Sequence, residues 1–381
     1  MPYQNLNILA DENMLMAQEI FSEFGKVSLC PGRSMTAEHL KGVDLLLVRS
    51  ITQVNETLLK DSQVKFVGTA TIGTDHIDQE YLEQNQIGFS NAPGCNADAV
   101  VDYVLSAIFY MAEQQGFDPA ERTYGIIGVG NVGGRLQKRL ESCGFKVLLN
   151  DPPRAETESG FVSLETLINE ADFICAHTPL TQTGDHPSYH LLAEKQLGAL
   201  QENTILLNAG RGSVIDNQAL LQIGTERDDL SFVLDVWEHE PRVSKDLADR
   251  CSLISPHIAG YSLDGKVRGT FMLYQAFCDY VGIKPEKELS DFLPEAEVSE
   301  IQQTDLSTLD LINTVYDPLI DDRLLRDTLE FSEEEQKTAF DQLRKSYRLR
   351  RELASLTVVQ PKLPKLLSGI GFQLAENNEL P

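Results

Sequence analysis

A glycine motif near the middle of the chain constrains its fold most strongly. Residues 128–133 read Gly-Val-Gly-Asn-Val-Gly, at the end of the strand-like run YGIIGV and at the start of the helical pattern GRLQKRLESCG. In this setting Gly128 permits a tight turn, Gly130 lets the backbone approach a pyrophosphate, and Gly133 allows strand and helix to pack closely. The motif therefore predicts a strand, turn and helix that bind a dinucleotide through the helix N-terminus.

An acidic residue at the end of the next strand indicates which dinucleotide binds. Asp151 follows the run KVLLN, about where a ribose-binding acid is expected. Its carboxylate can accept hydrogen bonds from the ribose hydroxyls and would repel a 2′-phosphate, which favours NAD over NADP. Arg154 lies nearby and weakens that preference slightly.

The chain alternates short apolar runs with amphipathic stretches, as parallel strands with crossover helices do. A complete dinucleotide-binding domain is predicted by runs at residues 124–129, 147–150, 173–176, 204–208, 232–236 and 253–255. A separate α/β layer is predicted by earlier runs at residues 6–10, 44–48, 65–67 and 87–89. An apolar helix near residues 97–114 and a polar linker separate the two series.

The composition of the sequence changes near Pro285, where acidic residues are mixed with Leu and Pro. Beyond this connector, Ser332 and Glu335 form a capping-box pattern that predicts a helix running to Leu353, and the last residues suggest strand, helix and strand. We expect an α/β protein with two Rossmann-like or flavodoxin-like doubly wound domains and a small C-terminal α+β domain. The expected parts are a substrate-binding domain at 1–95 with a return helix at about 262–285, a nucleotide-binding domain at 96–260, and a C-terminal domain at 286–381.

Composition excludes several classes of protein. The formal net charge of −26 makes nucleic acid a poor partner, because so acidic a surface repels phosphate. The most apolar stretch, residues 99–112, contains Asp102 and Ser106 and is too short to span a bilayer. The six cysteines form no C-x-x-C pair, so we expect neither a metal site nor a disulfide framework. The N-terminus lacks a basic region before Asp11, which argues against a signal peptide and for a cytoplasmic protein.

Three segments that each follow a predicted strand carry candidate catalytic residues. They are NAGRG with Arg211, LDVWEHEP with Glu240, and SPHIAGY with His257. Each residue alone has an ordinary structural explanation: a solvated turn, a surface charge or a hydrogen-bonded imidazole. Because the carboxyl ends of parallel strands border the ligand crevice, their joint placement favours one active site.

These motifs resemble those of the D-isomer-specific 2-hydroxyacid dehydrogenases over about residues 5–285. The resemblance implies that Arg211 grips the substrate carboxylate, that His257 exchanges the proton of the C2 hydroxyl, and that Glu240 orients the histidine. These roles suit the side chains, since guanidinium offers a two-pronged fork for a carboxylate and imidazole titrates near neutrality. The other histidines, His76, His177 and His239 among them, are expected to be structural.

The resemblance is sharpest to a branch of the family that oxidises 4-phospho-D-erythronate at C2 with NAD in vitamin B6 biosynthesis. It rests on residues 48–50, 66–78, 91–96, 150–154 and 257–261, and on the extra C-terminal part, which resembles a dimerisation domain. The resemblance implies substrate contacts at Arg49, Ser50, Thr71 and Tyr261. It implies cofactor contacts at Gly128, Gly130, Val132, Gly133, Asp151, Thr178, Asp235 and Gly260.

Two other functions stay open. One is a dehydrogenase acting on 3-phosphoglycerate, which shares the carboxylate, the C2 hydroxyl and the phosphate; Thr71 and the C-terminal part argue against it. The other is a catalytically idle, NAD(H)-sensing corepressor, which the full set of Arg211, Glu240 and His257 disfavours.

A basic cluster near the C-terminus also has two interpretations. Arg344, Arg348 and Arg351 are spaced to share one helix face, which predicts either a solvated surface or a site for the substrate phosphate, in the same subunit or across a dimer.

Overall fold

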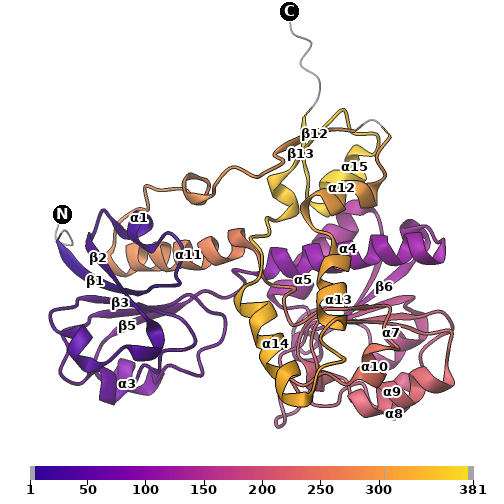
Figure 1. Cartoon of the computed structure of the whole chain (residues 1–381), viewed down its shortest axis with the longest axis horizontal. Coiled ribbons are helices and arrows are strands. Elements are labelled where there is room, and N and C mark those ends of the chain that lie inside the picture. Colours follow the sequence, from indigo (N-terminus) through magenta and orange to yellow (C-terminus); the bar gives the residue numbers. More distant parts are fainter. Residues whose placement is uncertain (1–4, 304, 376–381) are drawn as a thin grey trace, which may run out of the picture. The chain divides into compact units, whose positions relative to one another are not determined.

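The computed structural model describes residues 5–303 and 305–375. The chain divides into two compact units (Figure 1). The first joins Met1–Asn96 to Ser262–Glu295, and the second joins Ala97–Tyr261 to Ala296–Pro381.

The first unit is built on a parallel sheet of five strands in the order β2-β1-β3-β4-β5. The strands are β1 (Leu6–Asp11), β2 (Gly25–Cys30), β3 (Leu45–Val48), β4 (Phe66–Thr69) and β5 (Gly88–Asn91). The helices are α1 (Ala17–Phe21), α2 (Glu56–Leu59), α3 (Gln79–Gln84) and α11 (Leu263–Val281). All residues of β3 and β4 are buried, as expected of central strands in a parallel sheet covered on both faces. The four predicted strands are confirmed, and β2 is an edge strand that the sequence analysis missed.

The second unit contains a parallel sheet of six strands in the order β11-β10-β9-β8-β6-β7. The strands are β6 (Thr123–Ile127), β7 (Lys146–Asn150), β8 (Phe173–Ala176), β9 (Ile205–Asn208), β10 (Ser231–Leu234) and β11 (Leu253–Ile254). The helices are α4 (Ala97–Gln115), α5 (Asn131–Cys143), α6 (Pro152–Ala155), α7 (Leu164–Glu170), α8 (Glu194–Gly198), α9 (Asn217–Glu226) and α10 (Lys245–Ala248). All six predicted strands are confirmed. The strand order reverses between β6 and β8, and such a switch point is where open α/β sheets bind ligands.

The C-terminal residues add a small parallel sheet in the order β12-β13-β14. Its strands are β12 (Glu300–Gln302), β13 (Thr357–Val359) and β14 (Gln373–Ala375), and its helices are α12 (Thr308–Val315), α13 (Pro318–Arg326), α14 (Glu333–Lys345) and α15 (Pro364–Ile370). The predicted strand, helix and strand at the end are β13, α15 and β14. The capping box at Ser332 is confirmed, but the helix ends at Lys345 instead of reaching Leu353.

The C-terminal residues share a hydrophobic core with the six-stranded sheet. Helix α15 packs on α5, and α12 packs on α4 (Figure 1). At the first contact a Cβ on Gly369 would lie 2.8 Å from the backbone nitrogen of Cys143, so only glycine allows this approach. The boundary predicted at residue 286 stays a prediction, although contacts group the C-terminal residues with the second unit. Within the described residues no helix is long and apolar enough to cross a membrane.

Candidate active site

The glycine motif lies at the switch point of the six-stranded sheet. Gly128 has a φ of +85°, and a Cβ there would lie 2.8 Å from the backbone nitrogen of Thr178, which follows β8. A Cβ on Gly133 would lie 2.0 Å from the carbonyl oxygen of Gly128. Both positions therefore require glycine, one for its backbone conformation and both for lack of space.

Gly130 plays a different part in the motif. It is the N-cap of α5, and a Cβ built on it meets no atom within 4 Å. The space beside the first turn of α5 is therefore open to a ligand, and that turn presents backbone N–H groups. Thr178 supplies a further sign, since its buried Oγ1 has no hydrogen-bond partner among the described residues. The glycine motif and Thr178 thus fit a dinucleotide.

Asp151 lies beside the glycine turn, as the sequence predicts. Its Oδ2 accepts a hydrogen bond from the backbone nitrogen of Val129 at 2.8 Å, and its Oδ1 accepts from that of Arg154 at 3.3 Å. The guanidinium of Arg154 is engaged elsewhere: Nε donates to Glu158 at 2.9 Å and Nη1 to the carbonyl of Val129 at 2.7 Å. With its charge matched by Glu158, Arg154 does little to offset the carboxylate of Asp151.

Glu240 and His257 form a hydrogen-bonded pair. The Nδ1 of His257 lies 2.7 Å from Oε2 of Glu240, and Oε1 of Glu240 accepts from the backbone nitrogen of Trp237 at 2.8 Å. The imidazole remains one-third exposed. Because Nδ1 faces the carboxylate, Nε2 points away from it and is the ring nitrogen left to exchange a proton with a substrate. The pair is suited to general acid–base chemistry.

Arg211 is exposed and follows β9. Its Nη1 donates to the carbonyl of Gly210 at 2.8 Å, and the backbone carbonyl of Arg211 accepts from Nδ2 of Asn208 at 3.0 Å. The neighbouring Gly212 packs against the segment that carries Glu240. The three predicted catalytic residues thus all lie in the second unit, after the ends of β9, β10 and β11.

Asp235 acts on the backbone of the His257 segment. Its buried carboxylate accepts hydrogen bonds from Ser255 Oγ at 2.6 Å, from the nitrogen of Ile258 at 2.8 Å and from that of Ala259 at 3.0 Å. Burial raises the pKa of this carboxyl group. The hydrogen bonds lower it and so offset part of that rise. The resemblance implies only a cofactor contact for Asp235, and no pattern in the sequence indicates that its carboxylate holds this segment.

His177, which the sequence predicts to be structural, lies at the switch point, and both of its ring nitrogens are buried. Neither ring nitrogen has a hydrogen-bond partner among the described residues. Burial lowers its pKa to about 4, so the ring is neutral near pH 7. The position of His177 directly after β8 is the sequence signal that places it at the switch point, because residues at strand ends line such crevices.

The predicted substrate contacts of the first unit lie at the carboxyl ends of neighbouring strands. Arg49 and Ser50 follow β3, and Ser50 is exposed. Thr71 follows β4, and its Oγ1 lies 2.8 Å from Oγ1 of Thr69 and donates to the carbonyl of Gly73, also at 2.8 Å. The hydroxyl of Thr71 therefore already has two protein partners.

The C-terminal arginines do not share a helix face, because α14 ends at Lys345 and residues 347–352 form no regular secondary structure. Arg348 instead forms an ion pair with the buried Asp321. Arg344 remains on α14, with its guanidinium 5.9 Å from the ring centre of Tyr261, the predicted substrate contact in the second unit. The shared face predicted for Arg344, Arg348 and Arg351 is therefore wrong, since the helix it required stops after its first member.

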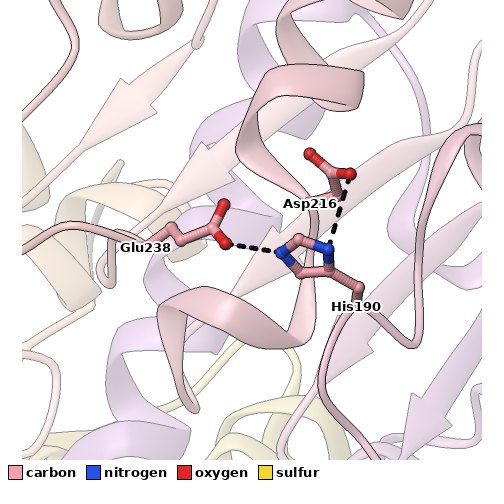
Figure 2. Close-up of side chains that lie close together, drawn as sticks. All are labelled: His190, Asp216 and Glu238. Atoms are coloured by element: carbon pink, nitrogen blue, oxygen red, sulfur yellow. Dashed lines mark hydrogen bonds and ion pairs between the residues drawn. The ribbon is translucent and has the colours of Figure 1, made fainter.

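A second cluster of titratable groups lies in the same unit. His190 stands between Glu238 and Asp216, with Nε2 2.5 Å from Glu238 Oε1 and Nδ1 3.5 Å from Asp216 Oδ2 (Figure 2). The ligand atoms of these three residues all lie within 4.8 Å of one another, which is close enough to hold a metal ion. The two ring nitrogens, however, face different carboxylates, so the ring bridges the two acids. The three residues are far apart in the sequence, and the sequence analysis did not group them.

Comparison with known proteins identifies the family. Residues 102–259 match the family described as D-isomer specific 2-hydroxyacid dehydrogenase, NAD binding domain, and residues 292–371 match a domain of unknown function (DUF3410). Erythronate-4-phosphate dehydrogenase of Proteus mirabilis is 50% identical over 96% of this chain and 99% of its own. That of Azotobacter vinelandii is 46% identical over 97% of this chain and 100% of its own.

Solved structures give the same fold. An NAD+-bound 3-phosphoglycerate dehydrogenase of Entamoeba histolytica is 25% identical, with a TM-score of 0.58 over 73% of this chain and 96% of its own. A D-2-hydroxyisocaproate dehydrogenase matches with a TM-score of 0.61 over 73% of this chain and 97% of its own, at 21% identity. The chain belongs to the erythronate-4-phosphate dehydrogenases, a family with the NAD-binding domain of the D-isomer-specific 2-hydroxyacid dehydrogenases.

Proposed function

We propose that this chain oxidises 4-phospho-D-erythronate at C2 with NAD, giving (R)-3-hydroxy-2-oxo-4-phosphooxybutanoate for vitamin B6 biosynthesis. The observation that carries the proposal is the 2.7 Å hydrogen bond between Glu240 and His257 on segments that follow two neighbouring strands. The names of the full-length relatives support the choice of substrate.

The reaction needs a base for the C2 hydroxyl and a cation for the carboxylate. His257 takes the hydroxyl proton on Nε2, while Glu240 holds Nδ1 and stabilises the charged ring. Arg211 binds the carboxylate and polarises the C2 oxygen. NAD, when bound, accepts the hydride that leaves C2.

Cofactor binding is assigned to the residues around the switch point. The backbone of the glycine motif and the first turn of α5 hold the pyrophosphate, and Asp151 binds the ribose hydroxyls. The full set is Gly128, Gly130, Val132, Gly133, Asp151, Thr178, Asp235 and Gly260. In the first unit Arg49, Ser50 and Thr71 contact the substrate, as does Tyr261 of the second.

The test is a comparison of substrates with the purified chain and NAD. We expect NADH absorbance to rise with 4-phospho-D-erythronate and much less with 3-phosphoglycerate. A higher kcat/KM for 3-phosphoglycerate would favour the other dehydrogenase. Tight NADH binding without turnover of either acid would favour a corepressor. Glu240→Gln, which retains an acceptor for Trp237 and loses the charge, should lower kcat.

We further propose that the chain is a cytoplasmic homodimer joined through its C-terminal part. Ile320 and Leu324, one turn apart on α13, are 42% and 44% exposed, as suits a surface covered by a partner. Light scattering should give twice the chain mass of 42.4 kDa, and the double variant Ile320→Glu/Leu324→Glu should give the monomer mass. A wild-type monomer would contradict the dimer without affecting the proposed reaction.

A further inference from the structure

One residue beside the catalytic histidine is held on both sides by charged side chains. The backbone nitrogen of Ala259 donates to Oδ2 of Asp235 at 3.0 Å. Its carbonyl oxygen accepts from Nη2 of Arg350 at 2.7 Å. Asp235 belongs to the nucleotide-binding sheet, whereas Arg350 comes from the C-terminal part of the chain. Two distant regions therefore hold the two peptide groups that flank Ala259, in the segment that carries His257 and Gly260.

Arg350 is built into the interior. It is 3% exposed, and its guanidinium lies 4.0 Å from the ring centre of Tyr316. The same Nη2 also donates to the carbonyl of Ala99 in the first turn of α4, at 2.9 Å. One guanidinium nitrogen thus joins α4, the segment after β11 and the C-terminal chain.

A second bond fixes the backbone that carries Arg350. The nitrogen of Leu353 donates to Oδ2 of the buried Asp102 on α4 at 2.8 Å. Since both Arg350 and Leu353 are anchored on α4, the guanidinium has a defined position from which to hold Ala259. The hydrogen bond between Arg350 and Ala259 is therefore supported on the side of the C-terminal chain as well.

The segment itself needs such support. His257 has a φ of +56°, a left-handed conformation that residues other than glycine adopt at a cost and keep only where the surroundings enforce it. The nitrogen of His257 is held by the carbonyl of Asp235 at 2.7 Å. Two residues later, the carbonyl of Ala259 is held by Arg350. These two contacts bracket the segment from His257 to Ala259.

We propose that Arg350 is a positioning residue for catalysis: by holding the Ala259 carbonyl, it fixes His257 in the place from which its ring exchanges the substrate proton. The inference rests on the proposed function of His257. It gives the C-terminal part a role in the reaction itself.

A matched control is available in the same chain. Arg326 of α13 also ties the C-terminal part to the nucleotide-binding sheet through two backbone carbonyls, those of Ala248 at 3.0 Å and Cys251 at 2.9 Å. Neither carbonyl belongs to residues 257–261. Arg326→Met therefore removes a docking contact of the same kind without touching the catalytic segment.

The experiment compares Arg350→Met, Arg350→Lys and Arg326→Met by steady-state kinetics and by hydrogen exchange of a peptide covering residues 255–261. Arg350→Met should lower kcat about tenfold or more with little change in KM, because small misplacements of a catalytic group cost up to about a hundredfold. It should also speed exchange of the Ile258 and Ala259 amides. Arg350→Lys should recover part of kcat, because an ammonium can donate to both carbonyls.

Arg326→Met should leave kcat within twofold and exchange of this peptide unchanged. The proposal is overturned if Arg350→Met retains wild-type kcat and exchange, if Arg326→Met causes the same losses, or if Arg350→Lys is as impaired as Arg350→Met. An inactive wild type would reject the proposed reaction, and the exchange comparison would still decide whether Arg350 holds the segment.

Discussion

A Cβ on Gly212 would lie 2.0 Å from the carbonyl oxygen of Trp237. Gly212 follows Arg211, and the nitrogen of Trp237 donates to Glu240. The segment that carries the arginine therefore presses directly on the segment that orients the histidine.

Gly212→Ala should consequently damage both stability and catalysis. Overpacking against backbone costs about 1–3 kcal/mol of unfolding free energy, and the displaced segments should lower kcat/KM about tenfold or more. Urea unfolding and initial rates measure the two effects. Gly198→Ala is the control, since its Cβ would meet nothing nearer than 3.9 Å. Normal activity of Gly212→Ala would show that the two segments move independently.

His257→Ala should lower turnover by about 10²- to 10⁴-fold while NADH binding stays nearly unchanged. Initial rates of oxidation and of reduction, with NADH binding followed by fluorescence, check this. Turnover within a few-fold of wild type would remove His257 from the mechanism.

NAD should be clearly preferred to NADP, because the carboxylate of Asp151 lies beside the glycine turn and Arg154 is paired with Glu158. Hydrogen bonds to a charged group contribute about 1.5–3 kcal/mol. Asp151→Ser should therefore lower the ratio of kcat/KM for NAD to kcat/KM for NADP about tenfold or more. Glu158→Gln is the companion variant, since it frees Arg154 and should improve the use of NADP. Equal use of both cofactors by the wild type would contradict this assignment.

Arg348→Ala should lower the free energy of unfolding and leave the KM for the phosphorylated substrate unchanged. Its removal leaves the buried carboxylate of Asp321 without its ionic partner, which costs about 3 kcal/mol. Arg323→Ala, at an exposed position on the same helix as Asp321, should cost little. A tenfold increase in KM for Arg348→Ala would restore the phosphate-binding interpretation.

His177 should make the protein less stable in mild acid. Burial lowers its pKa in the folded chain to about 4, from an ordinary histidine pKa of 6.5, so between these values the unfolded chain binds a proton that the folded chain does not. The free energy of unfolding should therefore fall as pH decreases from about 6.5 to about 4, by about 3 kcal/mol in total. His177→Asn should flatten this dependence, whereas His39→Asn, at an exposed position, should not. An identical pH dependence in His177→Asn would mean that other groups cause it.

The sequence predicted the six strands of the second sheet because each is a short apolar run. It missed β2, whose alternating Gly25–Cys30 pattern leaves most of its residues at least partly exposed. The strand ends pointed to the hydrogen-bonded pair of Glu240 and His257. The place of Arg211 in the same active site stays a prediction. The end of α14 was not predictable from helical spacing, because Arg348 and Arg350, in the irregular segment that follows, make long-range contacts with Asp321 and Ala259.

The contacts of Asp235 and Arg350 with Ala259 also lay outside what the sequence could predict. Both bonds end on backbone atoms, which carry no sequence signature. Similarly, His190 meets Asp216 and Glu238 only because three separate connecting segments fold together. Sequence patterns predict secondary-structure elements and strand ends. Long-range hydrogen bonds to the backbone become evident only in the folded structure.

The bonds of Arg350 also have a consequence for the order in which the protein matures on the ribosome. Its partners Ala259 and Ala99 are synthesised 91 and 251 residues earlier. The parallel sheets can pair while the chain is still emerging, but the histidine segment lacks its second anchor until residue 350 has left the exit tunnel. A nascent chain therefore completes its nucleotide-binding sheet before the segment that carries His257 gains its second anchor.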